Sequence, residues 1–120
     1  MIPLASMKHL DSLSLKKNDR LAIKETSNLL RQHFPVTVIK LFGSKARGED
    51  DPESDIDLLV LTSKQLSWLE RNAMSDAIFD IQLKHDVVLS LFVVSEEKWN
   101  KGILIAHPIH DTIEKEGIAA

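Results

Sequence analysis

The sequence contains no cysteine. A disulfide framework, a thiol nucleophile and a zinc–thiolate site are therefore excluded. An excess of positive charge is also missing, because 15 Lys and Arg residues stand against 18 Asp and Glu residues and give a formal net charge of -3. This balance argues against a protein that holds nucleic acid by general neutralisation of phosphates. Nucleic acid is therefore disfavoured as a direct substrate.

Long apolar runs are missing as well. No stretch could cross a bilayer, and the first residues, MIPLASMKHLDSL, lack a basic region followed by a sustained apolar segment. We therefore expect a cytoplasmic protein without a membrane association. A length of 120 residues predicts one compact domain over 18–120. Residues 1–17 have mixed polarity and no clear period, and they predict an N-terminal arm.

Apolar residues at helical spacing predict two helices, over 18–34 with Asn18 as N-cap and over 66–81. The face of the second helix is expected at Leu66, Leu69, Ala73, Ala77 and Ile81. Ser95, followed by two glutamates, predicts a helix to about His107, and Pro108 begins another that ends at Gly117. Trp68 and Trp99 lie on predicted helices, where packing in a core or an interface is the expected role.

Runs rich in β-branched and apolar residues predict strands over 36–42, 55–61 and 86–94. The order of elements is helix, strand, strand, helix, strand, helix, helix. This order is typical of an α/β or α+β fold, with a small mixed β-sheet packed with helices.

Two aspartates, Asp55 and Asp57, stand at the start of the second predicted strand. Because side chains alternate faces along a strand, the two carboxylates point the same way and lie close enough to share one divalent cation. Asp86 repeats the arrangement by opening the next predicted strand. Solvated loop carboxylates or a helix cap are the ordinary alternative for the pair, and an exposed residue paired with Lys84 or His85 is the alternative for Asp86.

The first predicted strand ends at Gly43-Ser44, and ten residues separate Ser44 from Asp55. Ala46-Arg47-Gly48 and Ser54-Asp55-Ile56-Asp57-Leu58 fall in fixed register within this segment. The pattern resembles the nucleotidyltransferase superfamily that contains DNA polymerase β and the aminoglycoside nucleotidyltransferases. In particular, the chain resembles the minimal nucleotidyltransferases, the antitoxin half of MNT/HEPN pairs. The resemblance covers about residues 34–94, extends loosely to Gly117, and implies the nucleotidyltransferase fold.

The resemblance also implies a catalytic site. Asp55 and Asp57 would hold Mg²⁺, and Asp86, the best match to a third acidic residue on a neighbouring strand, would complete the metal site and act on the incoming hydroxyl. Gly43 would let the backbone approach the triphosphate of ATP, and Ser44 would donate to its oxygens. A turn glycine and a local cap are the ordinary alternatives for these last two residues.

Arg47 is expected to contact phosphate or to brace the carboxylates, with an ordinary surface cation as the alternative. Lys45 occupies a place where arginine is common in the family, and we expect it to be exposed. The acidic residues between Glu49 and Glu53 are typical of a solvated loop and are left out of the site.

The expected activity is an Mg²⁺-dependent transfer of AMP from ATP to a hydroxyl of a partner protein. By resemblance, the acceptor would be a tyrosine of a HEPN toxin, and the chain itself contains no tyrosine. Two alternatives stay open: an antitoxin that neutralises its toxin by binding alone, with exposed apolar residues such as Ile103 and Ile105, and a transferase for a small molecule such as an aminoglycoside. The sequence leaves open whether the protein forms homo- or hetero-oligomers.

Overall fold

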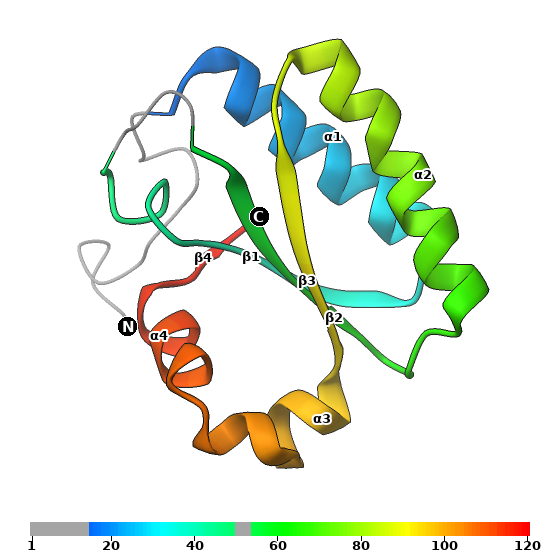
Figure 1. Ribbon diagram of the computed structural model, residues 1–120, viewed down its shortest axis with the longest axis vertical. Helices are drawn as coiled ribbons and strands as arrows, with labels where there is room; N and C mark the ends of the chain where they lie inside the picture. The colour runs from blue at the N-terminus through cyan, green and yellow to red at the C-terminus, as the bar shows by residue number, and fades with distance from the viewer. Residues whose placement is uncertain (1–14, 50–53) are drawn as a thin grey trace, which may run out of the picture.

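A four-stranded mixed sheet with helices on both faces forms the protein (Figure 1). The computed structural model describes residues 15–49 and 54–120. The elements in chain order are α1 (Lys17–His33), β1 (Val36–Phe42), β2 (Ile56–Thr62), α2 (Trp68–His85), β3 (Leu89–Ser95), α3 (Glu96–Lys101), the 3₁₀ helix η3 (Ile103–Ala106), α4 (Pro108–Glu116) and β4 (Ile118–Ala119). The expected fold class, a small mixed sheet with packed helices, is confirmed.

The strands lie in the order β3-β2-β1-β4. β1 pairs antiparallel with β2 and with β4, whereas β2 pairs in parallel with β3. α2 makes the crossover that a parallel pair requires. The end of β1 and the start of β2 therefore meet at one end of the sheet, where Phe42 lies opposite Asp57.

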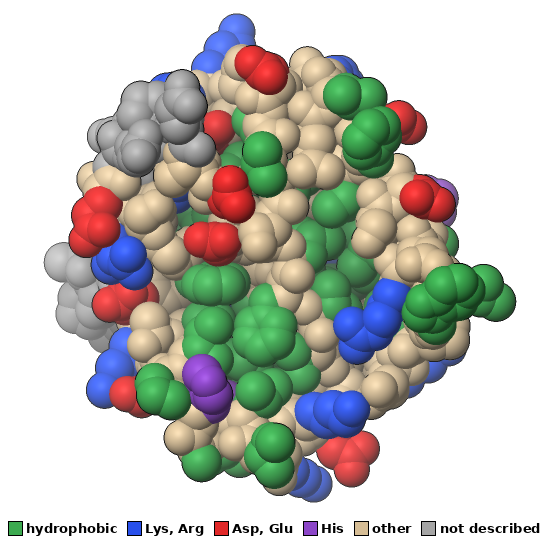
Figure 2. Space-filling view, in the orientation of Figure 1, with side chains coloured by type: hydrophobic (Ala, Val, Ile, Leu, Met, Phe, Trp, Pro, Cys, Tyr) green, Lys and Arg blue, Asp and Glu red, His purple; other side chains and the backbone are tan. Residues whose placement is uncertain are grey.

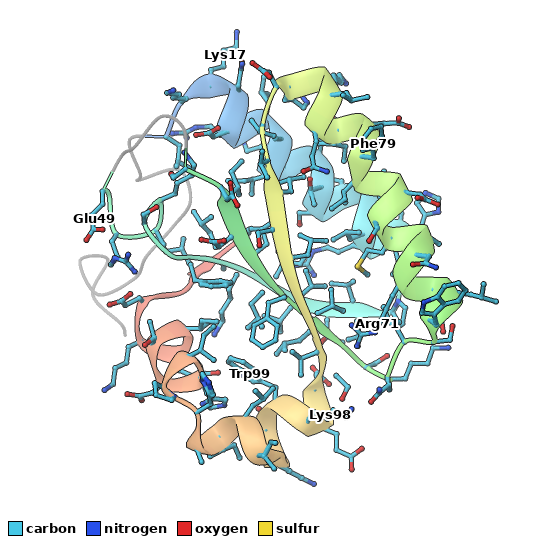
Figure 3. All side chains as sticks on the ribbon, in the orientation of Figure 1. Lys17, Glu49, Arg71, Phe79, Lys98 and Trp99 are labelled. Carbon is cyan, nitrogen blue, oxygen red and sulfur yellow. The ribbon has the colours of Figure 1, made fainter. Side chains whose placement is uncertain are left out.

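The two faces of the sheet carry separate apolar clusters. Ile56, Leu58 and Val60 of β2 pack in the cluster that α1 and α2 cover. The alternate residues Leu59 and Leu61 pack in a second cluster with α3 and α4, which includes Trp99 and Ile113. Trp99 is 1% exposed, as expected for a core residue, and its indole N–H donates to Glu114 Oε1 at 2.7 Å (Figure 3). β2 is thus buried on both faces, and only its polar start reaches the surface.

The predicted apolar face of α2 is wrong in part. Met74, Ile78 and Ile81 form the buried face, whereas Leu69 is 72% exposed. α2 carries apolar residues on both sides, so helical spacing alone could not choose between them. The exposed set is Trp68, Leu69, Phe79 and Leu83. Phe79 points away from the sheet in Figure 3, and the core role does not apply to Trp68, which is 73% exposed.

Several predicted boundaries also differ. α1 begins after Lys16 and not after Asn18. The helix predicted from Ser95 to His107 breaks at Gly102 into α3 and η3, although Ser95 caps α3 as expected by accepting from the Lys98 N–H. β4 was not predicted, because two residues carry no periodic pattern.

Part of the predicted N-terminal arm, residues 1–14, and part of the acidic loop, residues 50–53, lie outside the described residues. Within 15–49 and 54–120, every helix is too short or too polar to cross a bilayer.

Candidate functional site

The Gly43 turn, residues 43–48, connects the end of β1 to the loop before β2. Gly43 has φ +77°, and the amides of Ala46 and Arg47 both donate to its carbonyl, at 3.1 and 3.2 Å. Residues 44–48 thus form a hydrogen-bonded turn. Within the described part of the chain, no backbone carbonyl accepts from the amides of Ser44 and Lys45. These two N–H groups at the start of a helical turn are suited to an anion.

Gly43 is also in close contact with the aspartate motif. A Cβ atom added to Gly43 would overlap Asp57 Oδ2 and would lie 3.3 Å from its Cγ. Glycine is thus required here for two reasons, its left-handed backbone and the carboxylate against its Cα. The two sequence motifs are one physical unit, although ten residues separate them along the chain.

Asp57 is half-buried and Asp55 is exposed. Burial and, next, the negative charge of Asp55 raise the pKa of the Asp57 carboxyl, while the charge of Arg47 opposes them. Asp57 therefore carries a negative charge that its protein neighbours only partly compensate. Figure 2 shows red acidic side chains at the edge of a green apolar area on the face in view.

The structure does not bring Asp86 to this pair. β3 begins at Leu89, so the prediction that Asp86 opens a strand is wrong. Asp86 instead ends α2 in the left-handed conformation, with φ 53° and ψ 53°, and its N–H donates to the Gln82 carbonyl. Asp tolerates this conformation better than most residues. The sequence also suggested Lys84 or His85 as an ordinary partner for Asp86. Both of these side chains pair with Glu25 instead.

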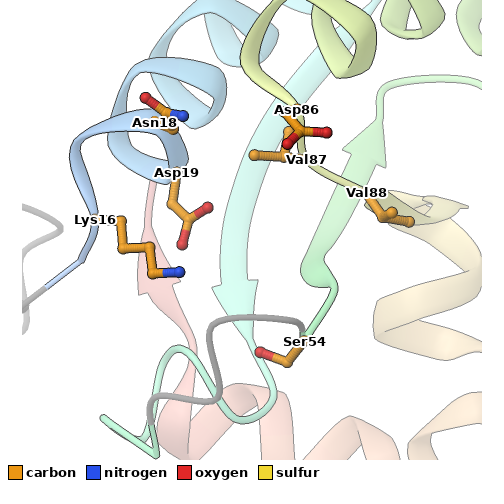
Figure 4. Close-up of a pocket in the computed structure, with 7 residues that line it drawn as sticks. All are labelled: Lys16, Asn18, Asp19, Ser54, Asp86, Val87 and Val88. Carbon is orange, nitrogen blue, oxygen red and sulfur yellow. The ribbon is translucent and has the colours of Figure 1, made fainter.

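Asp86 borders a cavity of about 410 Å³ that lies between the start of α1, Ser54 and the segment before β3 (Figure 4). The other side of this cavity carries Asp19, and neither Asp55 nor Asp57 lines it. Among residues 15–49 and 54–120, no three His, Cys, Asp or Glu side chains gather closely enough to hold one metal ion. The predicted group of three carboxylates is not assembled, and the role of Asp86 as a ligand stays a prediction.

Lys45 was expected at the surface, but only 3% of it is exposed. Its Nζ lies 2.9 Å from Asp19 Oδ2, and the two side chains are 1% and 7% exposed. This buried ion pair fastens the Gly43 turn to the first turn of α1. No local pattern links two residues 26 positions apart, which is why the sequence did not reveal the pair.

Arg47 lies on the exposed side of the Gly43 turn. Its guanidinium pairs with Glu49 at 3.2 Å and with Glu116, at the end of α4, at 3.6 Å. Glu49 is the main cause that raises the pKa of Arg47. Arg47 is close enough to Asp57 to lower the pKa of that carboxyl. It is placed to exchange a surface carboxylate for an anion beside the aspartate pair.

The donor set fits a magnesium–nucleotide complex. Mg²⁺ typically keeps several waters and takes one or two protein carboxylates together with substrate phosphates. Asp55 and Asp57 supply the carboxylates, and the charge of Asp57 is only partly compensated within the protein. The amides at the Gly43 turn and the guanidinium of Arg47 supply donors for phosphate oxygens.

A family model described as "Polymerase beta, Nucleotidyltransferase" matches residues 24–114. A candidate protein adenylyltransferase of Methanocaldococcus jannaschii is 38% identical over 88 residues, which cover 72% of this chain and 83% of that protein. A candidate protein adenylyltransferase of Haemophilus influenzae, MntA, is 27% identical over 99 residues, covering 82% and 85% of the two chains.

Two solved structures share the fold at low sequence identity. A toxin–antitoxin structure with AMP-PNP aligns with a TM-score of 0.55 and 19% identity, over 87% of this chain and 72% of that one. A complex of tri-AMPylated Shewanella oneidensis HEPN toxin with MNT antitoxin aligns with a TM-score of 0.52 and 20% identity, over 84% and 70% of the two chains.

The buried ion pair gives a first prediction, on folding. Lys45→Met leaves the Asp19 carboxylate buried without its partner and is expected to lower the free energy of unfolding by about 3–5 kcal/mol in urea denaturation. The double variant Asp19→Asn/Lys45→Met should recover most of this loss. Lys64→Met, which removes an exposed lysine, should change stability by no more than about 0.5 kcal/mol. Equal losses of stability in Lys45→Met and Lys64→Met would contradict a buried ion pair between Lys45 and Asp19.

A second prediction concerns pH. Because the pKa of Asp57 is raised in the folded chain, ionised Asp57 destabilises the fold, and this cost is present above the raised pKa and absent below the unfolded value. Asp57→Asn should therefore melt a few degrees higher than wild type at neutral pH. The difference should vanish in acid, where wild-type Asp57 is also neutral. A difference in melting temperature that does not change with pH would show that the ionisation of Asp57 is not its cause.

A third prediction separates the two roles of Gly43. Gly48 also has a positive φ, +75°, but a Cβ there meets nothing within 4 Å. Gly48→Ala should therefore cost only the backbone strain, about 1–2 kcal/mol. Gly43→Ala should cost the same strain and also displace the Asp57 carboxylate. The affinity of the protein for Mn²⁺ should therefore fall at least about tenfold, which is equivalent to about 1.4 kcal/mol. Unchanged Mn²⁺ binding in folded Gly43→Ala would show that the contact with Asp57 is unimportant.

Proposed function

Because this chain belongs to the polymerase β nucleotidyltransferase family, we propose that it transfers AMP from ATP to a hydroxyl of a partner protein. The observation that carries the proposal is the contact of the Gly43 turn with Asp57. It places amides that are suited to an anion next to Asp57, whose negative charge the protein only partly compensates. A metal-bound triphosphate needs both features within a few ångströms of each other.

Similar proteins support the choice of donor and partner. The relatives from M. jannaschii and H. influenzae are both named for adenylyl transfer to protein. One structural neighbour was solved with AMP-PNP, and another contains an AMPylated HEPN toxin bound to an MNT antitoxin. We therefore take ATP as the donor and a HEPN toxin as the partner. A tyrosine of that toxin is the acceptor that we propose. The chain has no tyrosine of its own, so modification of tyrosine must occur on another protein.

Each site residue has a defined part in this reaction. Asp55 and Asp57 hold Mg²⁺, which when bound neutralises charge on the phosphates during the in-line displacement. Gly43 admits the phosphate chain, and Ser44 with the amides of its turn donates to phosphate oxygens. Arg47 leaves Glu116 and pairs with the phosphate, a better partner for a bidentate guanidinium.

In the proposed transfer, the acceptor oxygen forms a bond to the α-phosphorus of ATP, and the bond from that phosphorus to the bridging oxygen breaks, which releases pyrophosphate. The hydroxyl proton passes to solvent water. Asp86 was expected to act on that hydroxyl, but it lies at the end of α2, outside any group of three potential ligands in the described residues. The proposal therefore depends on Asp55 and Asp57, and Asp86 is tested separately.

The test uses the purified protein, Mg²⁺, α-labelled ATP and a purified HEPN toxin as the acceptor. Asp57→Asn should reduce labelling of the partner at least about 100-fold, because the metal supplies several kcal/mol to the transition state. Asp76→Asn, which removes an exposed carboxylate from α2, is the matched control and should label normally. Labelling by Asp57→Asn at the wild-type rate would rule out this mechanism.

Neutralisation by binding alone is the second candidate, and one observation favours it. Ile103 is 91% exposed and Ile105 is 50% exposed, so η3 presents apolar side chains to solvent. Such residues are typical of a surface that another protein covers. Protection of cells from the toxin by Asp57→Asn as strong as that by wild type would favour this candidate over catalysis.

A further inference from the structure

β3 brings one polar residue to the face that carries the aspartate pair. β2 and β3 run parallel, and Asp57 is directly in register with Ser90. Residues that are paired in this way carry their side chains on the same face of the sheet. Ser90 is exposed, so its side chain is open to solvent at the position in register with Asp57.

The packing of β3 confirms which face Ser90 occupies. Phe92 and Val94, which alternate with Ser90, pack with Trp99 in the cluster under α3 and α4. Leu89 and Leu91 belong to the opposite cluster, under α1 and α2. On β2, Asp57 alternates in the same way with Leu59, which packs in the cluster under α3 and α4. Each of the two strands thus has one polar residue at its start, above an apolar residue on the same face.

The segment before β3 is held at both of its ends, which keeps Asp86 away from this position. Asp86 is fixed as the left-handed end of α2. Gln82 Oε1 accepts from the Leu89 N–H at 2.8 Å, and the Ile56 N–H donates to the Val88 carbonyl at 2.9 Å. A shift of β3 that brought Asp86 opposite Asp57 would move it by four residues and break both contacts.

We propose that Ser90 occupies the third position of the metal-binding face, so that this chain holds its divalent cation with two carboxylates and one neutral hydroxyl. The inference rests on the proposed function, since it concerns the same metal. The face then carries two negative charges, those of Asp55 and Asp57, where a third carboxylate would make three. A cation is held more weakly here than with aspartate at position 90, and no carboxylate of β3 accepts the proton of the acceptor.

The experiment is a titration of the purified chain with Mn²⁺, followed by electron paramagnetic resonance of the free ion. Ser90→Asp adds a third carboxylate beside Asp57 and should tighten Mn²⁺ binding at least about tenfold. Ser90→Asn has a similar size without the charge and should bind Mn²⁺ within about twofold of wild type. Thermal melting of each variant establishes that it is folded. Mn²⁺ affinity of folded Ser90→Asp equal to that of Ser90→Asn would overturn the proposal.

Asp86→Asn provides an independent arm. Asn also adopts the left-handed conformation, so α2 should end normally in this variant. Its Mn²⁺ affinity should match wild type, and a loss of tenfold or more would make Asp86 the third ligand and overturn the proposal even if Ser90→Asp does not fold. The titration uses neither ATP nor acceptor. Failure to label a partner would therefore count against the proposed function alone, whereas failure of the Ser90 prediction leaves adenylyl transfer standing.

Discussion

The close approach of the Gly43 backbone to the Asp57 carboxylate is the constraint on which the site depends. It follows from the antiparallel pairing of β1 with β2, which places the end of one strand opposite the start of the other. The Gly43 turn has little freedom beyond this contact, because Lys45 beneath it is tied to Asp19 of α1. The position of the turn is thus set by the sheet on one side and by a helix on the other. Such double support is what a preorganised phosphate site requires, since donors that need no rearrangement act most strongly on a transition state.

Charge is distributed unevenly around this turn. The Lys45 ammonium is buried against one carboxylate, and the Arg47 guanidinium is shared between Glu49 and Glu116. Asp57, in contrast, has Asp55 as a neighbour and is partly removed from water, so its ionised form is disfavoured. The structure concentrates unbalanced negative charge at one place on the sheet. A site that costs stability in the free protein is expected where a cation binds, because the ligand removes the repulsion.

The exposed surface of the protein bears on how an acceptor would be recognised. The aspartate motif lies at the end of the sheet where Phe42 pairs with Asp57, and Asp55 is exposed there. Most of the large apolar residues that are exposed lie on α2 and η3, including Trp68 and Ile103. A partner protein that covers such residues would gain specificity from burying them. The two proposed functions, adenylyl transfer and neutralisation by binding, are therefore compatible, because both need a docking surface.

The sequence by itself determined the features that depend on short-range pattern. The strand of residues 36–42 and the Gly43 turn follow from composition and from the conformational needs of glycine. The common direction expected for Asp55 and Asp57 from strand alternation stays a prediction, because β2 begins at Ile56 and not at Asp55. The tertiary structure decided the features that depend on contacts between distant segments. Lys45 is buried because α1 supplies Asp19, and α2 turns Met74 inward because the sheet selects one of two apolar sides. Ser90, and not Asp86, is in register with Asp57. The register of this parallel pair is set by packing on both faces of the sheet and by the left-handed end of α2. Neither of these has a periodic signal in the sequence.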